Sequence, residues 1–396
     1  MKNSRKVLYV ASTFGHLASF HKPYLAWLAQ QGAAVHAAAG GSTAELPGVS
    51  RYIPVSFEKS MFSPRNFAAV IQLRRVLREE KYDMISVHTS LAAFFTRLAV
   101  MTCGKQRPIV MNTVHGYLFD RDTPPLKREI LLAAERMTAP VTDWLLTMNR
   151  QDERIARQYR LGRHIVQTDG MGIDLARFSR PSAPERTWLR RQLSLRDDQL
   201  VLVYAAEFSG RKHQSMLIEA MAELPERVVL LLPGRGAALD KCKALADRLG
   251  VRERVRFPGF VSNIEDYYRA SDVCVSSSRS EGLPFNVMEA MACGLPAVLT
   301  NVKGHEDLVR PGENGELYPY DDRQAFCRAV RVAGEPAVRR MMSEKAEKSV
   351  RKYGLDTVFP ALTTLYYDAL TGKTGRPPSC CDRYACTAGT FSILSH

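Results

Sequence analysis

The sequence contains no apolar run long enough to cross a lipid bilayer. Its longest apolar stretch, Leu91–Cys103, includes Arg97 and falls short of the ~20 residues that a membrane-spanning helix needs. The apolar stretch near the N-terminus, Val7–Val10, is likewise too short for the core of a secretion signal. We therefore expect a cytoplasmic chain without a membrane-spanning segment.

Cysteines at metal-binding spacing are also lacking over the part of the chain that we expect to fold. Several of the eight cysteines stand in apolar surroundings, which is typical of reduced cytosolic thiols. Residues 371–396 are polar and rich in Gly, Pro and Cys, so we predict a disordered tail there. Cys380, Cys381 and Cys386 crowd into this tail, and weak metal binding by them is the alternative.

Acidic residues are scarce in the first half of the chain. Residues 1–180 contain 25 Lys and Arg against 14 Asp and Glu, whereas residues 181–396 contain 30 against 27. A basic N-terminal half favours an acidic partner, such as an anionic lipid surface, a pyrophosphate-bearing substrate or a nucleic acid. Nucleic acid is disfavoured, because the basic residues lack interleaved aromatic residues and form no recognisable binding motif.

What the chain does contain is a repeated alternation of short apolar segments with amphipathic ones. Short apolar segments flanked by polar residues or glycine are typical of buried parallel strands. The first series of predicted strands is Val7–Ala11, Val35–Ala39, Met84–Val87, Ile109–Thr113 and Trp144–Thr147. The second series is Val201–Ala205, Val228–Leu232, Val255–Phe257, Val273–Ser276 and Ala297–Leu299. The sequence therefore predicts an α/β protein with two doubly wound parallel-sheet domains.

The boundary between the two series lies at Arg177–Arg186, where Pro181 and Pro184 indicate a linker. We predict a first domain over residues 1–180 and a second over residues 187–355. An aromatic-rich helix is expected to follow over residues 356–370.

Residues 64–81 have a pattern of their own. Phe67, Val70, Ile71 and Leu77 recur at helical spacing, with four basic residues among them and after them. A basic amphipathic helix of this kind can lie on an anionic bilayer. The alternative is a surface helix that packs on the sheet and exposes a solvated basic face.

The most specific pattern places two carboxylates eight positions apart, at Glu281 and Glu289. Glu281 falls in a loop between a strand and a helix, and Pro284 suits the start of that helix. The unpaired N–H groups of a helix start form an anion site. Glu289 is flanked by Met288 and Ala290 in an apolar helix, where a carboxylate needs a partner. The pair can therefore hold two hydroxyl-bearing parts of one ligand with a phosphate between them.

A second candidate site directly follows the predicted strand Val201–Ala205. Gly210 is followed there by two cations, Arg211 and Lys212. Ligands of open α/β sheets bind at the carboxyl ends of strands, and Arg and Lys offer fork-like and point-charge contacts to a pyrophosphate. We interpret this pair as a phosphate clamp.

Three strand ends of the first domain carry further candidates for the cleft. His115 follows one predicted strand, His88 ends the strand before it, and Gly15 and His16 follow the first strand. A lone histidine is more often structural, so these interpretations depend on position alone. The segment around Gly15 has a single glycine and lacks the dinucleotide fingerprint, so binding of NAD is not indicated.

With these motifs the chain resembles a family-four glycosyltransferase of the GT-B fold, and in particular the bacterial capsule and exopolysaccharide enzymes. The resemblance runs from about Val7 to Leu370. Its most specific part is Glu281 through Glu289, which resembles the E-x7-E motif of these retaining enzymes, and Arg211 and Lys212 match the pair that holds the donor pyrophosphate.

Weaker matches complete the resemblance. Pro233–Gly236 takes the place of the family's Gly-x-Gly loop, Phe257–Phe260 followed by Asp272 resembles its base-pocket segment, and Phe20–Leu25 is similar to the exopolysaccharide subgroup. The chain departs from the family at Met171–Asp174, where relatives often have Asn-Gly-x-Asp, and in the first loop, which lacks paired glycines.

The resemblance implies roles for individual residues. Glu281 and His115 would be catalytic, with Glu281 facing the donor sugar and His115 beside it, and Glu289 would bind the ribose. The final helix would cross back onto the first domain. The other implied donor contacts are Arg211, Lys212, Leu283, Pro284, Phe285, Gly234 and Phe260.

The resemblance further implies a retaining transferase that moves a hexosyl or N-acetylhexosaminyl group from a nucleotide diphosphate sugar, by our interpretation UDP-linked. The acceptor would be a lipid-linked saccharide of surface polysaccharide synthesis, at the inner face of the cell membrane. No metal or other cofactor is expected, because two cations already face the phosphates and no Asp-x-Asp motif is suitably placed. A nucleotide-sugar epimerase of the same fold and a non-catalytic nucleotide-sugar-binding module are the alternatives.

Overall fold

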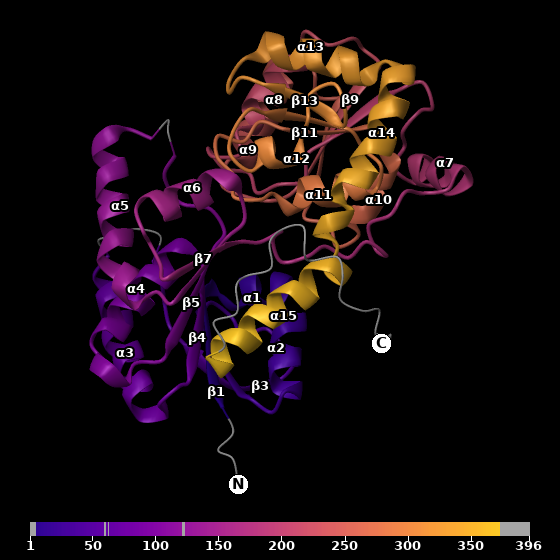
Figure 1. Ribbon diagram of the computed structural model, residues 1–396. Coiled ribbons are helices and arrows are strands. Elements are labelled where there is room, and N and C mark those ends of the chain that lie inside the picture. Colours follow the sequence, from indigo (N-terminus) through magenta and orange to yellow (C-terminus); the bar gives the residue numbers. More distant parts are fainter. Residues whose placement is uncertain (1–4, 59–60, 62, 121–122, 373–396) are drawn as a thin grey trace.

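The computed structural model describes residues 5–58, 61, 63–120 and 123–372 and forms two α/β domains (Figure 1). This arrangement confirms the predicted fold class. The predicted tail over residues 371–396 lies, from residue 373 onward, outside the described residues.

The first domain is built on a seven-stranded sheet in the order β3-β2-β1-β4-β5-β6-β7, with every neighbouring pair parallel. Its strands are β1 (Lys6–Thr13), β2 (Ala34–Gly40), β3 (Val49–Pro54), β4 (Met84–His88), β5 (Ile109–Val114), β6 (Trp144–Thr147) and β7 (His164–Gln167). Its helices are α1 (Phe14–Phe20), α2 (Lys22–Gln30), α3 (Pro64–Glu80), α4 (Ser90–Met101), α5 (Pro125–Thr138) and α6 (Arg150–Gln158). The strand order reverses between β1 and β4, and the carboxyl ends of strands at such a switch point are where ligands of open sheets bind.

The second domain repeats this plan with a six-stranded parallel sheet in the order β10-β9-β8-β11-β12-β13. Its strands are β8 (Leu200–Val203), β9 (Val228–Pro233), β10 (Val255–Gly259), β11 (Val273–Ser276), β12 (Ala297–Thr300) and β13 (Gly315–Tyr318). Its helices are α7 (Ala183–Gln192), α8 (Gln214–Ala220), α9 (Leu239–Arg248), α10 (Ile264–Ala270), α11 (Phe285–Ala292), α12 (His305–Leu308), α13 (Arg323–Gly334) and α14 (Pro336–Val350).

The central strands are apolar throughout because both faces of each sheet are covered. Successive side chains of a strand point to opposite faces, and in β1 Val7 and Tyr9 enter one core cluster while Leu8 and Val10 enter another. All four side chains are fully buried. The continuous apolar segments of the sequence thus reflect burial on two sides.

Three strands were not predicted from the sequence, namely β3, β7 and β13. Each lies at an edge of its sheet and mixes exposed or half-buried residues with buried ones. An edge strand has a neighbour on one side only, so its sequence lacks the continuous apolar pattern of a central strand.

The last helix, α15 (Leu355–Thr371), returns to the first domain, as the family resemblance implied (Figure 1). The hydroxyl of Tyr9 in β1 donates to the hydroxyl of Tyr366 at 2.5 Å. The Tyr366 hydroxyl also lies 3.0 Å from Oγ of Ser86 in β4. These contacts fix α15 to the centre of the first sheet.

The two segments that cross between the domains are hydrogen-bonded to each other. Ile173 lies in the first crossing and donates its backbone N–H to the carbonyl of Tyr353 at 2.9 Å. Leu355, at the start of α15, donates in turn to the carbonyl of Ile173 at 2.8 Å.

A buried ion pair joins the domains at a second place. Lys303 follows β12, and its Nζ lies 3.1 Å from Oδ1 of Asp152 in α6. It also donates to the backbone carbonyls of Tyr117 at 2.7 Å and Phe119 at 3.2 Å. Both charged side chains are almost completely buried, so each depends on the other for compensation of its charge.

Among the described residues, no helix is both long and apolar enough to cross a membrane.

We predict that Lys303→Met lowers the free energy of unfolding by about 3–5 kcal/mol, because it leaves Asp152 buried and without its counter-charge. Denaturant or thermal unfolding measures the loss. The matched control is Lys6→Met, which removes a 41% exposed lysine from its pair with Glu80 and is expected to cost under about 1 kcal/mol. Equal losses in the two variants would contradict the assigned role of the Lys303–Asp152 pair.

Candidate functional site

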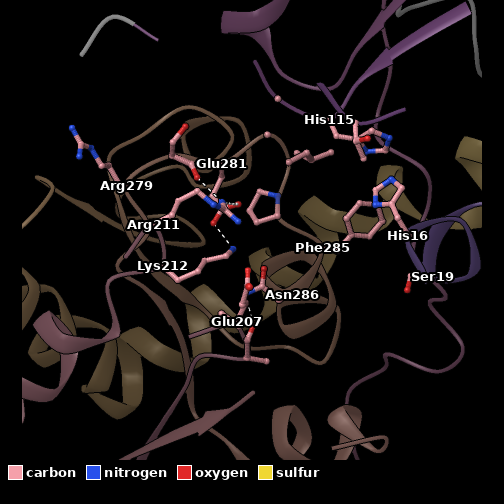
Figure 2. Close-up of a pocket in the computed structure, with 18 of the residues that line it drawn as sticks. His16, Ser19, His115, Glu207, Arg211, Lys212, Arg279, Glu281, Phe285 and Asn286 are labelled. Carbon is pink, nitrogen blue, oxygen red and sulfur yellow. Dashed lines mark hydrogen bonds and ion pairs between the residues drawn. The ribbon is translucent and has the colours of Figure 1, made fainter. Parts of the chain in front are cut away.

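A cleft of about 2500 Å³ separates the two domains. Its walls come from segments that follow β1, β4 and β5 in the first domain and β8, β9 and β11 in the second. Figure 2 shows basic and acidic side chains of the second domain on one side of this cleft and histidines of the first domain on the other.

Most of the site residues predicted from the sequence line this cleft. They are Glu281, His115, Arg211, Lys212, Glu289, Leu283, Pro284, Phe285, Gly234, Phe260 and His16. Two predicted cleft residues do not line it. Gly15 lies inside α1, because the helix begins directly after β1 and no open loop intervenes. His88 is fully buried at the end of β4, behind His115.

Glu281 is held by three side chains of its own domain. Its Oε1 lies 2.5 Å from Nζ of Lys212 and accepts a hydrogen bond from Oγ of Ser278 at 2.5 Å. Its Oε2 lies 3.2 Å from the guanidinium of Arg211, which also donates to the carbonyl of Ser280 at 2.9 Å. The predicted clamp and the first carboxylate of the motif therefore form one cluster, drawn with dashed lines in Figure 2.

Charge decides the ionisation of this cluster. Burial by itself would raise the pKa of Glu281, but the charges of Lys212 and Arg211 outweigh burial and lower that pKa to about 2. Burial also lowers the pKa of Lys212, and the nearby Glu281 carboxylate offsets part of this effect. The carboxylate is therefore ionised at neutral pH.

The loop that carries Glu281 is held by small polar residues at the end of β11. Ser277 donates to the carbonyls of Lys212 at 2.9 Å and His213 at 2.8 Å. Thr300, at the end of β12, donates to the carbonyl of Ser278 at 2.6 Å. These bonds bind the Arg211–Lys212 loop to the Glu281 loop.

Gly282 allows the backbones of the two domains to touch. A Cβ at Gly282 would lie 1.7 Å from the carbonyl oxygen of His115, and a Cβ at Gly116 would lie 2.9 Å from Cα of Gly282. The side chain of Asn149 in the first domain donates to the carbonyl of Gly282 at 3.0 Å. Only glycine fits here, and the contact places Glu281 beside the His115 segment.

Helix α11 presents its N-terminus and Glu289 to the cleft. The helix begins at Phe285 with Pro284 as its N-cap, so the N–H groups of its first turn are available to an anion. Glu289 lies one turn further on and accepts a hydrogen bond from the hydroxyl of Tyr268 at 3.4 Å. Burial raises the pKa of Glu289 to about 7, although Tyr268 and the charge of Arg177 act to lower it.

The loop after β9 approaches the loop after β8 very closely. Gly234 has φ +151°, and a Cβ there would lie 2.0 Å from the carbonyl oxygen of Ala206. Phe260 is 70% exposed, and the guanidinium of Arg235 lies 4.9 Å from the centroid of its ring. A flat, exposed ring next to this loop offers a surface on which a planar base can stack.

Asp272, part of the segment compared with the family's base pocket, lies elsewhere. It precedes β11, at the amino end of that strand, and pairs with Arg186 at 2.9 Å and Arg190 at 3.3 Å. It also accepts the backbone N–H of Val201 at 2.8 Å. Asp272 therefore fixes α7 to the sheet and does not line the cleft.

Several residues of the site were missed by the sequence analysis. Tyr268 contacts Glu289, Ser278 holds Glu281, and Arg177 of the linker lines the cleft. Serine, tyrosine and arginine are common outside sites, so their positions in the sequence gave no distinguishing signal. Ser278 alone could have been suspected, since it lies three residues before Glu281 in the same loop.

Candidate metal ligands lie in the first domain, at its wall of the cleft and directly behind it. Among the described residues, the group of three or more His, Cys, Asp or Glu side chains with converging ligand atoms is His16, His21 and His115, without any carboxylate. Near Arg211 and Lys212, the described part of the chain has no such group. The second-domain wall thus offers cations, a helix N-terminus and two carboxylates, which together suit a ligand with phosphates and hydroxyls.

Two family descriptions match this chain. Residues 24–177 match Glycosyltransferase Family 4, and residues 185–349 match Glycosyl transferases group 1. Each match covers most of one domain.

Individual proteins agree with these families. The chain is 33% identical over 368 residues to EpsD of Bacillus subtilis (strain 168), which is named as a putative glycosyltransferase. The aligned region covers 92% of this chain and 96% of EpsD. It is 24% identical over 317 residues to the Escherichia coli UDP-Gal:alpha-D-GlcNAc-diphosphoundecaprenol alpha-1,3-galactosyltransferase. This aligned region covers 78% of this chain and 81% of the galactosyltransferase.

Solved structures show the same fold. HepE of Anabaena in complex with UDP has a TM-score of 0.73 at 20% identity and covers 92% of this chain and 100% of its own. WaaG, a glycosyltransferase of lipopolysaccharide biosynthesis, has a TM-score of 0.71 at 19% identity, with coverage of 92% and 100%. Both Rossmann-like domains and the cleft between them are thus those of GT-B enzymes, and the chain belongs to the family-four glycosyltransferases.

Proposed function

We propose that this glycosyltransferase moves a sugar from a UDP-sugar to a lipid-linked saccharide acceptor, with retention of anomeric configuration, in the synthesis of a surface polysaccharide. The observation that carries the proposal is the cluster of Arg211, Lys212 and Glu281 beside the N-terminus of α11, with Glu289 one turn into that helix.

The donor end of the cleft matches the parts of a nucleotide diphosphate sugar. Arg211, Lys212 and the first turn of α11 supply positive charge for the two phosphates. In this proposal Glu289 accepts hydrogen bonds from ribose hydroxyls, and the base stacks on the exposed Phe260. The HepE complexes with UDP, and with UDP and glucose, support UDP as the nucleotide.

The chemistry follows from where charge develops. As the bond from the anomeric carbon to the phosphate oxygen breaks, negative charge grows on the leaving phosphate, and Lys212, Arg211 and the helix start stabilise it. These groups do the work for which other transferases use a divalent ion, so no metal is needed at the phosphates. Retention fits a same-face substitution in which the leaving phosphate takes the acceptor proton, with Glu281 and His115 positioning the sugar.

The acceptor is proposed by analogy with the Escherichia coli relative, whose name specifies a sugar diphosphoundecaprenol. Such an acceptor lies at a membrane. The basic first domain, with 25 Lys and Arg against 14 Asp and Glu over residues 1–180, favours an anionic surface.

We infer that helices α3 and α5 of the first domain form the face that meets this membrane. On α3, Leu77 is buried against the sheet and Val70 is half-buried, whereas Phe67 and Ile71 are 54% and 70% exposed. On α5, Leu126 is 76% exposed as well. Helices α3, α4 and α5 lie along the same edge of the domain (Figure 1).

The same two helices also carry exposed basic residues. Those on α3 and α5 with exposed side chains include Arg65, Arg74, Arg75, Arg78, Lys127 and Arg136. Apolar groups that enter the interface and cations that bind anionic lipid act together in peripheral attachment. Lys127 of this set also lines the cleft, so the start of α5 is next to it.

Lys212→Met should lower kcat/KM for transfer by about 10²–10³-fold, because it removes one charge that stabilises the leaving phosphate. Turnover is measured with UDP-sugars and an undecaprenyl-diphosphate-linked saccharide, with and without a chelator. The control is Lys241→Met, an exposed lysine on α9 of the same domain, which should leave turnover unchanged.

Two outcomes would contradict the proposal. Transfer by a folded Lys212→Met protein at the rate of the unchanged protein would remove Lys212 from the mechanism. Epimerisation of a UDP-sugar incubated without acceptor, in the absence of any transfer, would favour an isomerase of the same fold.

Binding of a UDP-sugar should release up to about half a proton at pH 7. The pKa of Glu289 is about 7, and ribose hydroxyls that donate to the carboxylate favour its ionised form, so binding lowers that pKa. Affinity should therefore rise from pH 6 to pH 8. Calorimetry in buffers of different ionisation enthalpy measures the proton, because the phosphates of a UDP-sugar do not titrate in this range.

Glu289→Gln is the control for that measurement. It should bind more weakly at pH 8 and release no proton. Proton release that persists in Glu289→Gln would assign the titration to another group and argue against the ribose contact.

The double variant Phe67→Glu/Ile71→Glu should weaken binding to vesicles that contain anionic lipid by tenfold or more, because charged groups cannot enter the apolar interface. Vesicle co-sedimentation at low and moderate salt gives the affinity. Trp188→Glu is the matched control, since Trp188 is 58% exposed on α7 of the second domain. Equal loss in both variants, or none in either, would exclude the α3 face as the attachment site.

A further inference from the structure

Four histidines gather at the carboxyl ends of the central strands of the first domain. His16 comes from α1, His21 from the junction of α1 and α2, His88 from the end of β4, and His115 from the segment after β5. The ring centroids of His16 and His115 are 4.9 Å apart, and those of His21 and His88 are 4.0 Å apart. The chain thus brings together imidazoles that are up to 99 positions apart in the sequence.

Three of these rings converge in the manner of metal ligands. One ring nitrogen from each of His16, His21 and His115 lies within 4.8 Å of the other two. Zinc–nitrogen bonds are about 2.0–2.1 Å long, so an ion at the centre of the three would draw each nitrogen inward by under about 1 Å.

His21 has no other evident use. Its side chain is fully buried, and among the described residues neither Nδ1 nor Nε2 has a hydrogen-bond partner. The same holds for Nε2 of His16. Buried polar atoms are nearly always paired, and an unpaired one costs free energy of folding. A bound ion would supply the missing partner of these nitrogens.

The protonation state suits a cation. Burial lowers the pKa of His16 to about 4 and lowers the pKa values of His21 and His115 well below 6.5. The imidazoles are therefore neutral near pH 7, which is the form that binds metals. A ligand set of imidazoles alone favours Zn²⁺ and its transition-metal neighbours over Mg²⁺ or Ca²⁺.

We propose that His16, His21 and His115 bind one divalent transition-metal ion, for which Zn²⁺ and Co²⁺ are the probes. His88 supports the site from behind. Its Nδ1 lies 3.4 Å from Nε2 of His115, and its Nε2 lies 2.9 Å from Oγ of Ser86. Contacts of this kind orient a metal-binding imidazole.

The ion would lie in the first-domain wall of the cleft. His16 and His115 line the cleft, whereas His21 does not, and Figure 2 shows His16 and His115 across the cleft from Lys212. The site is therefore separate from the proposed donor-phosphate contacts, although His115 belongs both to it and to the proposed sugar contact. The inference rests on the geometry of the histidines and not on the identity of the donor or the acceptor.

The test is a titration of the full chain, purified without a polyhistidine tag and stripped with a chelator. Co²⁺ is added and its visible absorption recorded, and Zn²⁺ binding is measured by calorimetry. We expect one equivalent of each ion and cobalt bands typical of nitrogen ligation. His21→Phe and His16→Asn should each weaken binding at least tenfold, because each removes one of three ligands.

His164→Asn is the matched control, since His164 lies in β7, outside the cluster, and its substitution should leave metal affinity unchanged. Thermal unfolding of the stripped variants checks that they fold. If His21→Phe does not fold, the half-buried His16 decides the result. Failure of the unchanged chain to bind one equivalent, or affinity that survives both substitutions, would overturn the proposal.

Discussion

The contact on which the rest of the cleft depends is the close approach of two backbones at Gly282. A side chain there would collide with the carbonyl of His115, so the absence of a Cβ sets how near the domains can come. Gly304, in the next loop of the same domain, packs closely behind this segment, because a Cβ there would lie 2.4 Å from the carbonyl oxygen of Gly282. The buried Lys303–Asp152 ion pair joins the domains beside this contact. Glycine therefore permits the short distance between the two backbones, and the ion pair stabilises it.

The carboxylate of Glu281 determines where two cations of the cleft lie. Glu281 binds Lys212 and Arg211, which orients both cations before any phosphate arrives. A pyrophosphate carries more negative charge than one carboxylate and competes for the same donors. We therefore expect bound phosphates to share Lys212 and Arg211 with Glu281, which keeps its hydrogen bond from Ser278. The same ion pairs thus stabilise the fold and prepare the site.

Sequence reasoning succeeded where a single local pattern determines the structure. Central strands such as β1 and β8 are apolar on both faces, and the spacing of Glu281 and Glu289 follows from one loop and one helical turn. Sequence reasoning failed where a structural feature depends on residues that are distant in the sequence and come together only in the fold. The edge strands β3, β7 and β13 carry mixed patterns, and the partnership of Lys303 with Asp152 joins positions 151 apart. His21 resembles any residue before a helix until folding brings His16 and His115 beside it.

The hydrogen-bonded pair of crossings at Ile173 and Tyr353–Leu355 has a mechanical consequence. A single linker would leave the two domains free to swing and twist in all directions. Two crossings that run side by side act as one hinge, so widening of the cleft is confined to rotation about a line through them. The contact of Gly282 with His115 lies close to this hinge, because Gly170, three residues before Ile173, packs against Leu283. The return of α15 to the first domain thus converts domain motion into a one-dimensional opening and closing over the Glu281 cluster.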